Sequence, residues 1–308
     1  MSMPALGNAE LHHRAGALAN GPWSVDLSAS RAGWSWSSLR VLDLAAGQSA
    51  GLATGEEEVL VLPLTGSCLV RSGQQELALQ GRASVFAGPS DFVYVAPGQE
   101  LTLESRDGGR FALPGAKVGG QGPTVPEGLR YQAARAVPVE LRGAGNCSRR
   151  VVNYCMPGTF DARRLMACEV VTPAGNWSSY PPHKHDEDRP GETQLEEIYY
   201  FELARGPGGE DGAAYQRVYG AGPRPVDVLA EVHGGDVVLI PHGYHGPSMA
   251  APGYDMYYLN VMAGPGPRAW LASDDPEHAW VRASWQGKEV DPRLLGDDGH
   301  AADNGGVQ

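Results

Sequence analysis

Short apolar runs, each bounded by Gly, Pro, Asn or Asp, recur along most of the chain. Runs of this length and spacing are typical of β-sandwiches and β-barrels. Helical signals come late, where Ser273–Pro276 can cap a helix through Trp285 and Asp291-Pro292 can open a shorter one. The pattern predicts an all-β fold with few short helices. The predicted strands include Leu39–Leu44, Val59–Leu64, Phe92–Ala96, Leu165–Val171, Ile198–Leu203, Val237–Ile240 and Met256–Met262.

A weak internal repeat divides the chain into two similar halves. Glu57–Leu62 resembles Glu196–Phe201, and each segment is followed by a second strand that ends in a Pro-containing turn, Asp91–Gly98 in the first half and Asp236–Gly243 in the second. The repeat predicts two copies of one β-barrel. We expect an N-terminal arm (1–22), an N-terminal barrel (23–113), a connecting segment (114–150), a C-terminal barrel (151–295) and a disordered tail (296–308).

Composition and charge narrow the functional classes. The chain has 308 residues, 42% of them hydrophobic, and a net charge of -12 with no basic stripe. This balance disfavours a nucleic-acid or membrane partner. The four cysteines form no CxxC pair, and the N-terminus lacks the apolar stretch of a signal peptide. We expect reduced thiols, a cytoplasmic location and a homo-oligomer.

No histidine occurs between His13 and His183. Any metal chemistry therefore belongs to the second barrel, and we expect the first barrel to bind no metal. His183 and His185 are two residues apart, so on a strand both imidazoles point into one interior while Lys184 points to the other face.

A glutamate can join this pair, and strand register selects which one. One face of the next strand carries Glu197 among Leu195, Tyr199 and Phe201, and the other face carries Glu196. The first face is the more apolar, so we expect it to point inward. A carboxylate buried there needs a partner, and a metal ion would be one.

The fourth ligand is expected from the strand Asp236–Ile240, whose Pro-x-Gly turn precedes His245. His242 in the same turn is a rival for this role. Three histidines and one glutamate suit Zn²⁺, Mn²⁺, Fe²⁺, Co²⁺ or Ni²⁺ better than Ca²⁺ or Mg²⁺. We expect one divalent ion on His183, His185, Glu197 and His245, with Zn²⁺ first and Mn²⁺ or Fe²⁺ as alternatives.

These segments resemble the two motifs of the cupins, which are jelly-roll β-barrels. The match is closer to one branch, the 5-deoxy-glucuronate isomerase family of myo-inositol catabolism, and related to it are the 4-deoxy-L-threo-5-hexosulose-uronate ketol-isomerases. The stretch from His185 to Glu197 is longer than in a generic cupin, and Pro241 to His245 is one residue shorter. The segments that carry the resemblance are Trp177, Pro182–His185, Leu195–Phe201, Pro241–Pro247 and Tyr257–Gly264.

The resemblance implies a bicupin fold and an aldose–ketose isomerase that converts 5-deoxy-D-glucuronate to 5-dehydro-2-deoxy-D-gluconate, with the metal as a Lewis acid. A metal-dependent cupin oxygenase, a related uronate ketol-isomerase and a non-enzymatic sugar-binding cupin are the alternatives. Candidates for the catalytic acid or base are Glu192, Glu196 and a tyrosine such as Tyr199 or Tyr258. Candidates for binding the sugar-acid carboxylate are Arg189, Lys184 and Arg163.

Overall fold

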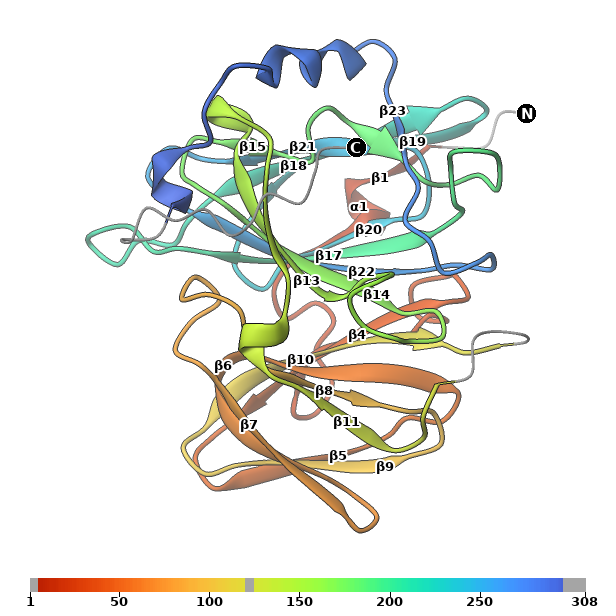
Figure 1. Cartoon of the computed structure of the whole chain (residues 1–308), viewed down its shortest axis with the longest axis vertical. Coiled ribbons are helices and arrows are strands. Elements are labelled where there is room, and N and C mark those ends of the chain that lie inside the picture. The colour runs from red at the N-terminus through yellow and green to blue at the C-terminus, as the bar shows by residue number, and fades with distance from the viewer. Residues whose placement is uncertain (1–4, 120–124, 296–308) are drawn as a thin grey trace.

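The structure is a computed structural model that describes residues 5–119 and 125–295. Two β units lie one above the other along the long axis, with residues 23–119 and 125–132 in the lower unit and residues 134–295 in the upper one (Figure 1). The four cysteines are buried and unpaired, as the sequence predicts. The tail predicted for residues 296–308 lies outside the described residues.

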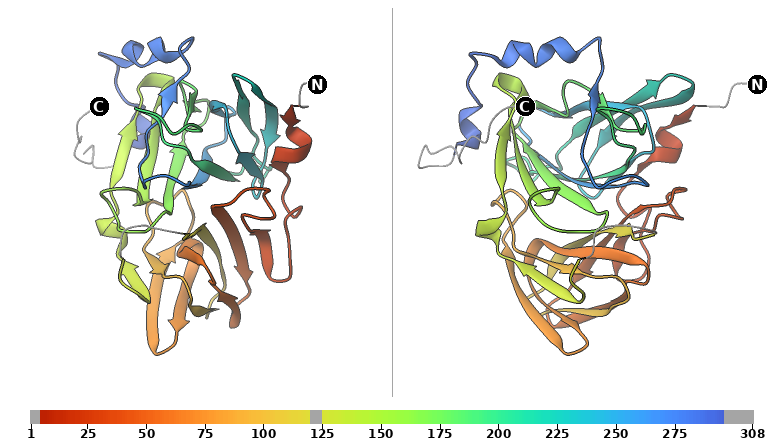
Figure 2. Two further views of the ribbon diagram at one scale, coloured as in Figure 1. Left: turned by 90° about the vertical axis from the view of Figure 1, so that its right-hand side faces the viewer. Right: turned by 45° about the vertical axis from the view of Figure 1, so that its right-hand side comes forward.

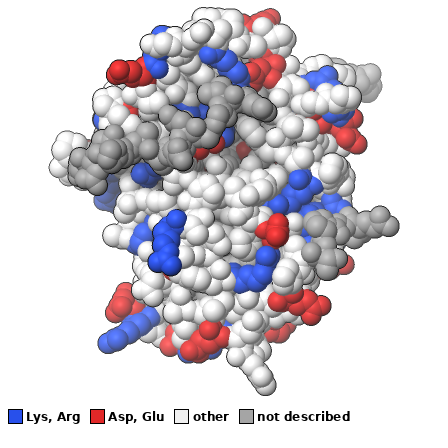
Figure 3. Space-filling view, viewed as in Figure 1, with Lys and Arg blue, Asp and Glu red and all other residues white. Residues whose placement is uncertain are grey.

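Charges of both signs are spread over the surface. In Figure 3, Lys and Arg side chains are interspersed with Asp and Glu among the described residues of one face. The described residues include no helix with the length and apolar character needed to cross a membrane.

The lower unit is one nine-stranded sheet that folds back on itself (Figure 2). Its strands are β3 (Trp23–Leu27), β4 (Ser37–Leu44), β5 (Gln48–Ala53), β6 (Glu57–Ser72), β7 (Gln75–Arg82), β8 (Phe92–Val95), β9 (Glu100–Ser105), β10 (Gly109–Lys117) and β11 (Leu129–Gln132). The order is β11-β8-β6-β10-β4-β3, with β7 and β9 on β6 and β5 on β9. Its interior is filled by buried apolar side chains, among them Val59, Val61, Leu103 and Phe111.

The long strand β6 closes this sheet. Its first half pairs with β8 and β10, and its second half pairs with β7 and β9. The change of partner falls at Gly66, which has a φ of +78° and whose added Cβ would lie 2.4 Å from the carbonyl oxygen of Gly108. Only glycine tolerates both conditions, so this residue lets one strand serve two parts of the sheet.

The upper unit consists of two seven-stranded sheets with the core between them. Sheet A contains β1 (Leu6–Gly7), β15 (Trp177–Ser178), β16 (His183–Lys184), β18 (Ala214–Ala221), β19 (Arg224–Val232), β21 (Tyr244–Ala250) and β23 (Ser273–Asp274). Sheet B contains β2 (His12–His13), β12 (Val139–Arg142), β13 (Arg149–Cys155), β14 (Met166–Thr172), β17 (Glu196–Leu203), β20 (Val237–Ile240) and β22 (Met256–Ala263).

The internal repeat is confirmed by strand pairing. In the lower unit β6 lies between β8 and β10, and in the upper unit β17 lies between β20 and β22. Leu60 pairs with Tyr94 in the first copy, and Ile198 pairs with Leu239 in the second. The two segments therefore occupy equivalent places, but the register differs by one residue from the sequence match, because Glu58 and not Glu57 is equivalent to Glu196.

The expected N-terminal arm and the expected connecting segment both contribute strands to the sheets. β1 pairs with β19, and β2 pairs with β20, so the N-terminal arm, with α1 (Asn8–Leu11), lies on the upper unit. Within the segment 114–150, β11 pairs with β8 below and β12 pairs with β13 above. Two turns of 3-10 helix, η1 (Ala134–Ala136) and η2 (Gly145–Cys147), complete that segment.

The predicted α-helix through Trp285 is wrong. Its first residues form β23, which pairs with β16, and the rest forms two 3-10 turns, η3 (Ala279–Val281) and η4 (Ala283–Trp285). Sheet pairing at the start leaves too short a stretch for a stable α-helix. The shorter helix predicted at Asp291-Pro292 is confirmed as a 3-10 turn. The side chain of Asp291 accepts a hydrogen bond from the amide of Arg293 at the start of η5 (Pro292–Leu294).

Two glutamates clamp the units together in a reciprocal manner. Glu58 of β6 accepts the backbone N–H groups of Arg163, Arg164 and Leu165, at 2.9, 2.6 and 2.7 Å, just before β14 of the other unit. Glu196 of β17 accepts the three N–H groups of residues 35–37, at 2.8, 2.8 and 3.0 Å, at the start of β4. Each carboxylate thus satisfies three amides that sheet pairing leaves free.

We predict that Glu58→Ala lowers the free energy of unfolding by about 3 kcal/mol or more, because three amides at the junction lose their acceptor. Glu76→Ala is the matched control, since Glu76 forms only a 2.7 Å ion pair with Arg71 at the surface and is worth less than about 1 kcal/mol. Urea denaturation of both variants measures the difference. Equal losses would show that the clamp contributes nothing beyond a surface ion pair.

Candidate metal centre

Three histidines of sheet A meet inside the upper unit. His183 of β16 pairs directly with His245 of β21, and His185 follows β16 by one residue. One ring nitrogen from each histidine lies within 4.8 Å of the others. His185 and His245 are buried, at 2% and 0% exposure. Cross-strand pairing and the two-residue alternation of a strand therefore produce this cluster.

A glutamate from the opposite sheet faces the histidines. The Oε2 atom of Glu197, on β17, lies 3.0 Å from Nε2 of His185 and 3.0 Å from Nε2 of His245. Nδ2 of Asn260 donates to its Oε1 at 2.5 Å. The interior thus brings together three imidazoles and one carboxylate, with the second carboxylate oxygen held by an amide.

Metal binding needs neutral imidazoles and an ionised carboxylate, and the pKa shifts of His183 and Glu197 match these states, whereas the pKa of His185, which burial would lower, is raised by its contact with Glu197. Burial would raise the pKa of Glu197, but His245 and His185 outweigh it and lower that pKa to about 2. Burial, with His245 and His185 beside it, holds the pKa of His183 well below its usual value. At neutral pH Glu197 is charged and His183 has a free lone pair.

The geometry around His245 also fits a divalent cation. Its Nε2 is buried without a hydrogen-bond partner among the described residues, because the 3.0 Å approach of Glu197 lacks hydrogen-bond geometry. Its Nδ1 lies 3.4 Å from the carbonyl oxygen of Gly243, a neighbour of the kind that orients a metal-ligating histidine. A buried nitrogen without a partner is costly unless something else binds it. His242, the rival fourth ligand, is half-buried and lies outside the cluster.

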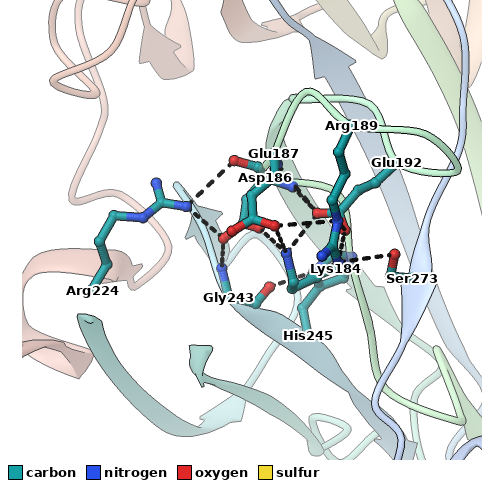
Figure 4. Close-up of polar contacts among 9 residues, drawn as sticks. All are labelled: Lys184, Asp186, Glu187, Arg189, Glu192, Arg224, Gly243, His245 and Ser273. Atoms are coloured by element: carbon teal, nitrogen blue, oxygen red, sulfur yellow. Dashed lines mark hydrogen bonds and ion pairs between the residues drawn. The ribbon is translucent and has the colours of Figure 1, made fainter. Parts of the chain in front are cut away.

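An ionic network on the other face of β16 holds the loop that connects the ligands (Figure 4). Nζ of Lys184 donates to Asp186 and to Glu192, both at 2.7 Å. Arg189 donates to the second oxygen of Glu192 at 2.6 and 2.9 Å. Both carboxylates are buried, so the network forms a packed unit rather than a solvated loop.

One carboxylate in this network connects the two ligand-bearing segments. Asp186 directly follows His185, and its Oδ2 accepts the amide N–H of Gly243 at 2.9 Å, two residues before His245 (Figure 4). Arg224 donates to the same oxygen at 2.8 Å. The side chain of Asp186 therefore fixes the distance between two histidines without entering the site.

The three cations proposed from the sequence lie outside the cavity beside the histidines. Lys184 and Arg189 belong to the network of Figure 4, and the amide of Arg163 joins the clamp at Glu58. The cavity is instead lined by side chains that include Arg142, Arg149, His183, Glu197, Tyr258 and Trp270. The two arginines come from the expected connecting segment and its border, where no sequence motif marks them.

Of the proposed acids and bases, only the tyrosines line the cavity. Tyr258 stacks on Tyr199 at 4.8 Å between ring centroids, and burial raises its pKa. Burial would raise the pKa of Glu192, but hydrogen bonds from Lys184 and the Asp186 amide lower it to about 2. Glu196 points away from the barrel interior, as the strand register predicts. It lies at the junction of the two units, where burial raises its pKa.

Comparison with known families and proteins gives consistent matches. The model of the KduI/IolB family matches residues 11–281. The "5-deoxy-glucuronate isomerase" of Geobacillus kaustophilus is 40% identical over 263 residues, which cover 84% of this chain and 91% of that protein. The protein of the same name from Bacillus subtilis strain 168 is 36% identical over 259 residues, covering 83% and 91%.

Solved structures agree with the fold. The crystal structure of an IolB-like protein from Salmonella typhimurium LT2 superposes with a TM-score of 0.78 at 32% identity, covering 88% of this chain and 98% of that one. An oxalate decarboxylase of Bacillus subtilis superposes with a TM-score of 0.60 at 11% identity, covering 89% and 81%. The second likeness concerns the fold alone, and it confirms the bicupin architecture.

We predict that His185→Ala lowers the bound divalent metal sharply, because it removes one donor from the cluster. His242→Ala is the matched control and keeps the metal, since this residue lies outside the cluster. Elemental analysis of protein purified without added chelator measures both. Full occupancy of the His185 variant, or loss in the control alone, would contradict the ligand assignment.

We also predict that the ion pairs of Glu192 stabilise the protein only above acid pH. Its pKa in the folded protein is about 2, below the ordinary 4.5, so the stabilisation is present above pH 4.5 and is lost as the pH falls toward 2. The gap in unfolding free energy between the wild type and Glu192→Gln should therefore shrink from pH 7 to pH 3. Asp211→Asn, in an exposed ion pair, should show little gap at either pH.

Proposed function

This chain belongs to the KduI/IolB family, and from that premise we propose that it interconverts 5-deoxy-D-glucuronate and 5-dehydro-2-deoxy-D-gluconate in myo-inositol degradation. The observation that carries the proposal is the cluster of three histidines and Glu197 beside a cavity of the upper unit. Relatives named 5-deoxy-glucuronate isomerase, matched along more than 90% of their length, support the choice of substrate.

We assign His183, His185, Glu197 and His245 as the ligands of one divalent ion, with Zn²⁺ preferred to Mn²⁺ or Fe²⁺ for this donor set. When bound, such an ion polarises the aldehyde and stabilises the negative charge that develops on oxygen. Glu197 offsets part of the cation's charge, and Asn260 keeps that carboxylate in place through its 2.5 Å hydrogen bond.

Isomerisation moves a proton between neighbouring carbons through an enediol, so a side chain in the cavity must exchange protons with the sugar. Tyr199 and Tyr258 are the best supported of the candidates because both line the cavity. Burial raises the pKa of Tyr258 and keeps its phenol protonated at neutral pH, so Tyr258 is suited to donate to the sugar oxygen that gains negative charge and not to accept the proton from carbon. The position and the low pKa of Glu192 favour a structural role for that residue.

The walls of the cavity restrict access of water to the reacting carbons. The Trp270 ring packs edge-on against His183, with 5.9 Å between centroids, and Met262 lies on the lining from β22. A water-poor site strengthens each electrostatic contact with the developing charge. It also protects an enediol from side reactions.

We predict that Glu197→Gln reduces turnover of 5-deoxy-D-glucuronate at least ~100-fold, because the neutral amide weakens the ligand set and its charge balance. Glu196→Gln is the matched neighbour. It keeps one oxygen that can accept from the amides of Trp36 and Ser37, and it lies outside the ligand cluster, so its turnover should stay within a few-fold of the wild type.

Both variants are assayed under anaerobic conditions, in parallel with wild-type enzyme before and after treatment with a chelator. Product formation without oxygen distinguishes the isomerase from an oxygenase. The ketol-isomerase substrate, 4-deoxy-L-threo-5-hexosulose uronate, serves as the competing substrate. Wild-type turnover in Glu197→Gln would exclude the metal-centred reaction.

A further inference from the structure

Two arginines stand opposite each other on neighbouring strands at the edge of the cavity. Arg142 of β12 and Arg149 of β13 are direct cross-strand partners, and both line the cavity next to His183 and Glu197. Like charges at directly opposed positions of a sheet destabilise it. A fold that holds two arginines at these positions therefore needs a negative charge close to them.

In the part of the chain that the structure describes, Arg142 forms an ion pair and Arg149 does not. Arg142 forms a two-pronged ion pair with Glu140, with Nε–Oε1 and Nη2–Oε2 distances of 2.9 Å, and lies over the ring of Trp270. Arg149 donates from Nη1 to the carbonyl oxygen of Cys147 at 3.0 Å. Among the described residues, no carboxylate lies within ion-pair distance of Arg149.

Arg149 is also deeply buried, with 6% of its surface exposed. Burial and the nearby Arg142 lower the pKa of its guanidinium to about 10, so it stays charged at neutral pH. An isolated buried cation costs several kcal/mol unless a partner compensates it. The cavity lining therefore combines a metal-ligand cluster with a guanidinium that lacks an anion.

We propose that Arg149 binds the carboxylate of the sugar acid and thereby selects acidic over neutral sugars. Arg142, held by Glu140, is a positioning residue that raises the positive potential around it. The planar guanidinium can hold a carboxylate through two parallel hydrogen bonds, a geometry that lysine lacks. The proposal rests on the proposed function, because it assigns the non-reacting end of that substrate to one end of the same cavity.

The test compares 5-deoxy-D-glucuronate with its C6 carboxamide, which has nearly the same shape but no charge. Calorimetry measures the binding of both to metal-loaded wild-type protein, Arg149→Met and Arg149→Lys. We expect the wild type to prefer the acid, and Arg149→Met to lose at least ~30-fold in affinity for the acid but little for the amide. Arg149→Lys should retain part of the preference.

Arg282→Met is the matched control. Arg282 lies 5.6 Å from the centroid of the same Trp285 ring, as Arg149 does, but it is paired with Asp274 and half exposed. Its loss should leave the preference for the acid unchanged. Thermal melting provides a second readout, because removing an uncompensated buried charge should not lower the melting temperature of Arg149→Met.

Three outcomes would overturn the proposal: no preference for the acid in the wild type, an undiminished preference in Arg149→Met, or an equal loss for acid and amide. The proposed function is judged separately, from wild-type turnover of the same acid. Tight, Arg149-dependent binding of the acid without turnover would leave this inference standing and reject the isomerase.

Discussion

The upper unit is organised around a negative charge buried between two sheets. Glu197 lies on the sheet opposite the histidines, at 3% exposure, and a carboxylate in that position is unfavourable without compensation. Its partners come from both sides, with His185 and His245 at 3.0 Å from one oxygen and Asn260 on the other. The packing of the two sheets, the direct pairing of His183 with His245 and the ionic network behind β16 all serve to keep these groups in register.

The lower unit has a similar fold but no carboxylate at the position equivalent to Glu197. Glu58 and Glu196 occupy matching places on β6 and β17, because each accepts three amides from the other unit. One residue further along, the lower unit has Val59 where the upper unit has Glu197. Val59 lies in an apolar cluster, so hydrophobic packing fills the place in the lower unit that a buried carboxylate takes in the upper one.

The sequence predicts those parts of the site that depend on local alternation. His183 and His185 share a face because a strand alternates every two residues, and the apolar neighbours of Glu197 identify the inward side of β17. Arg142 and Arg149 could not be predicted in this way. Their proximity arises from the pairing of β12 with β13, and neither strand has a strong apolar pattern. The contacts of Glu196 at the junction could not be predicted from the sequence either, because its partners are amides more than 150 residues away along the chain.

The exchange of clamps at the junction relates the two units by an approximate symmetry. Each unit extends a glutamate from its central strand and offers three free amides before a neighbouring strand, so each gives and receives the same contact. Such self-complementarity is the mark of a two-fold symmetric dimer. Each unit of this bicupin therefore holds the position that a partner subunit would take in such a dimer, and the junction is an isologous interface formed within one chain.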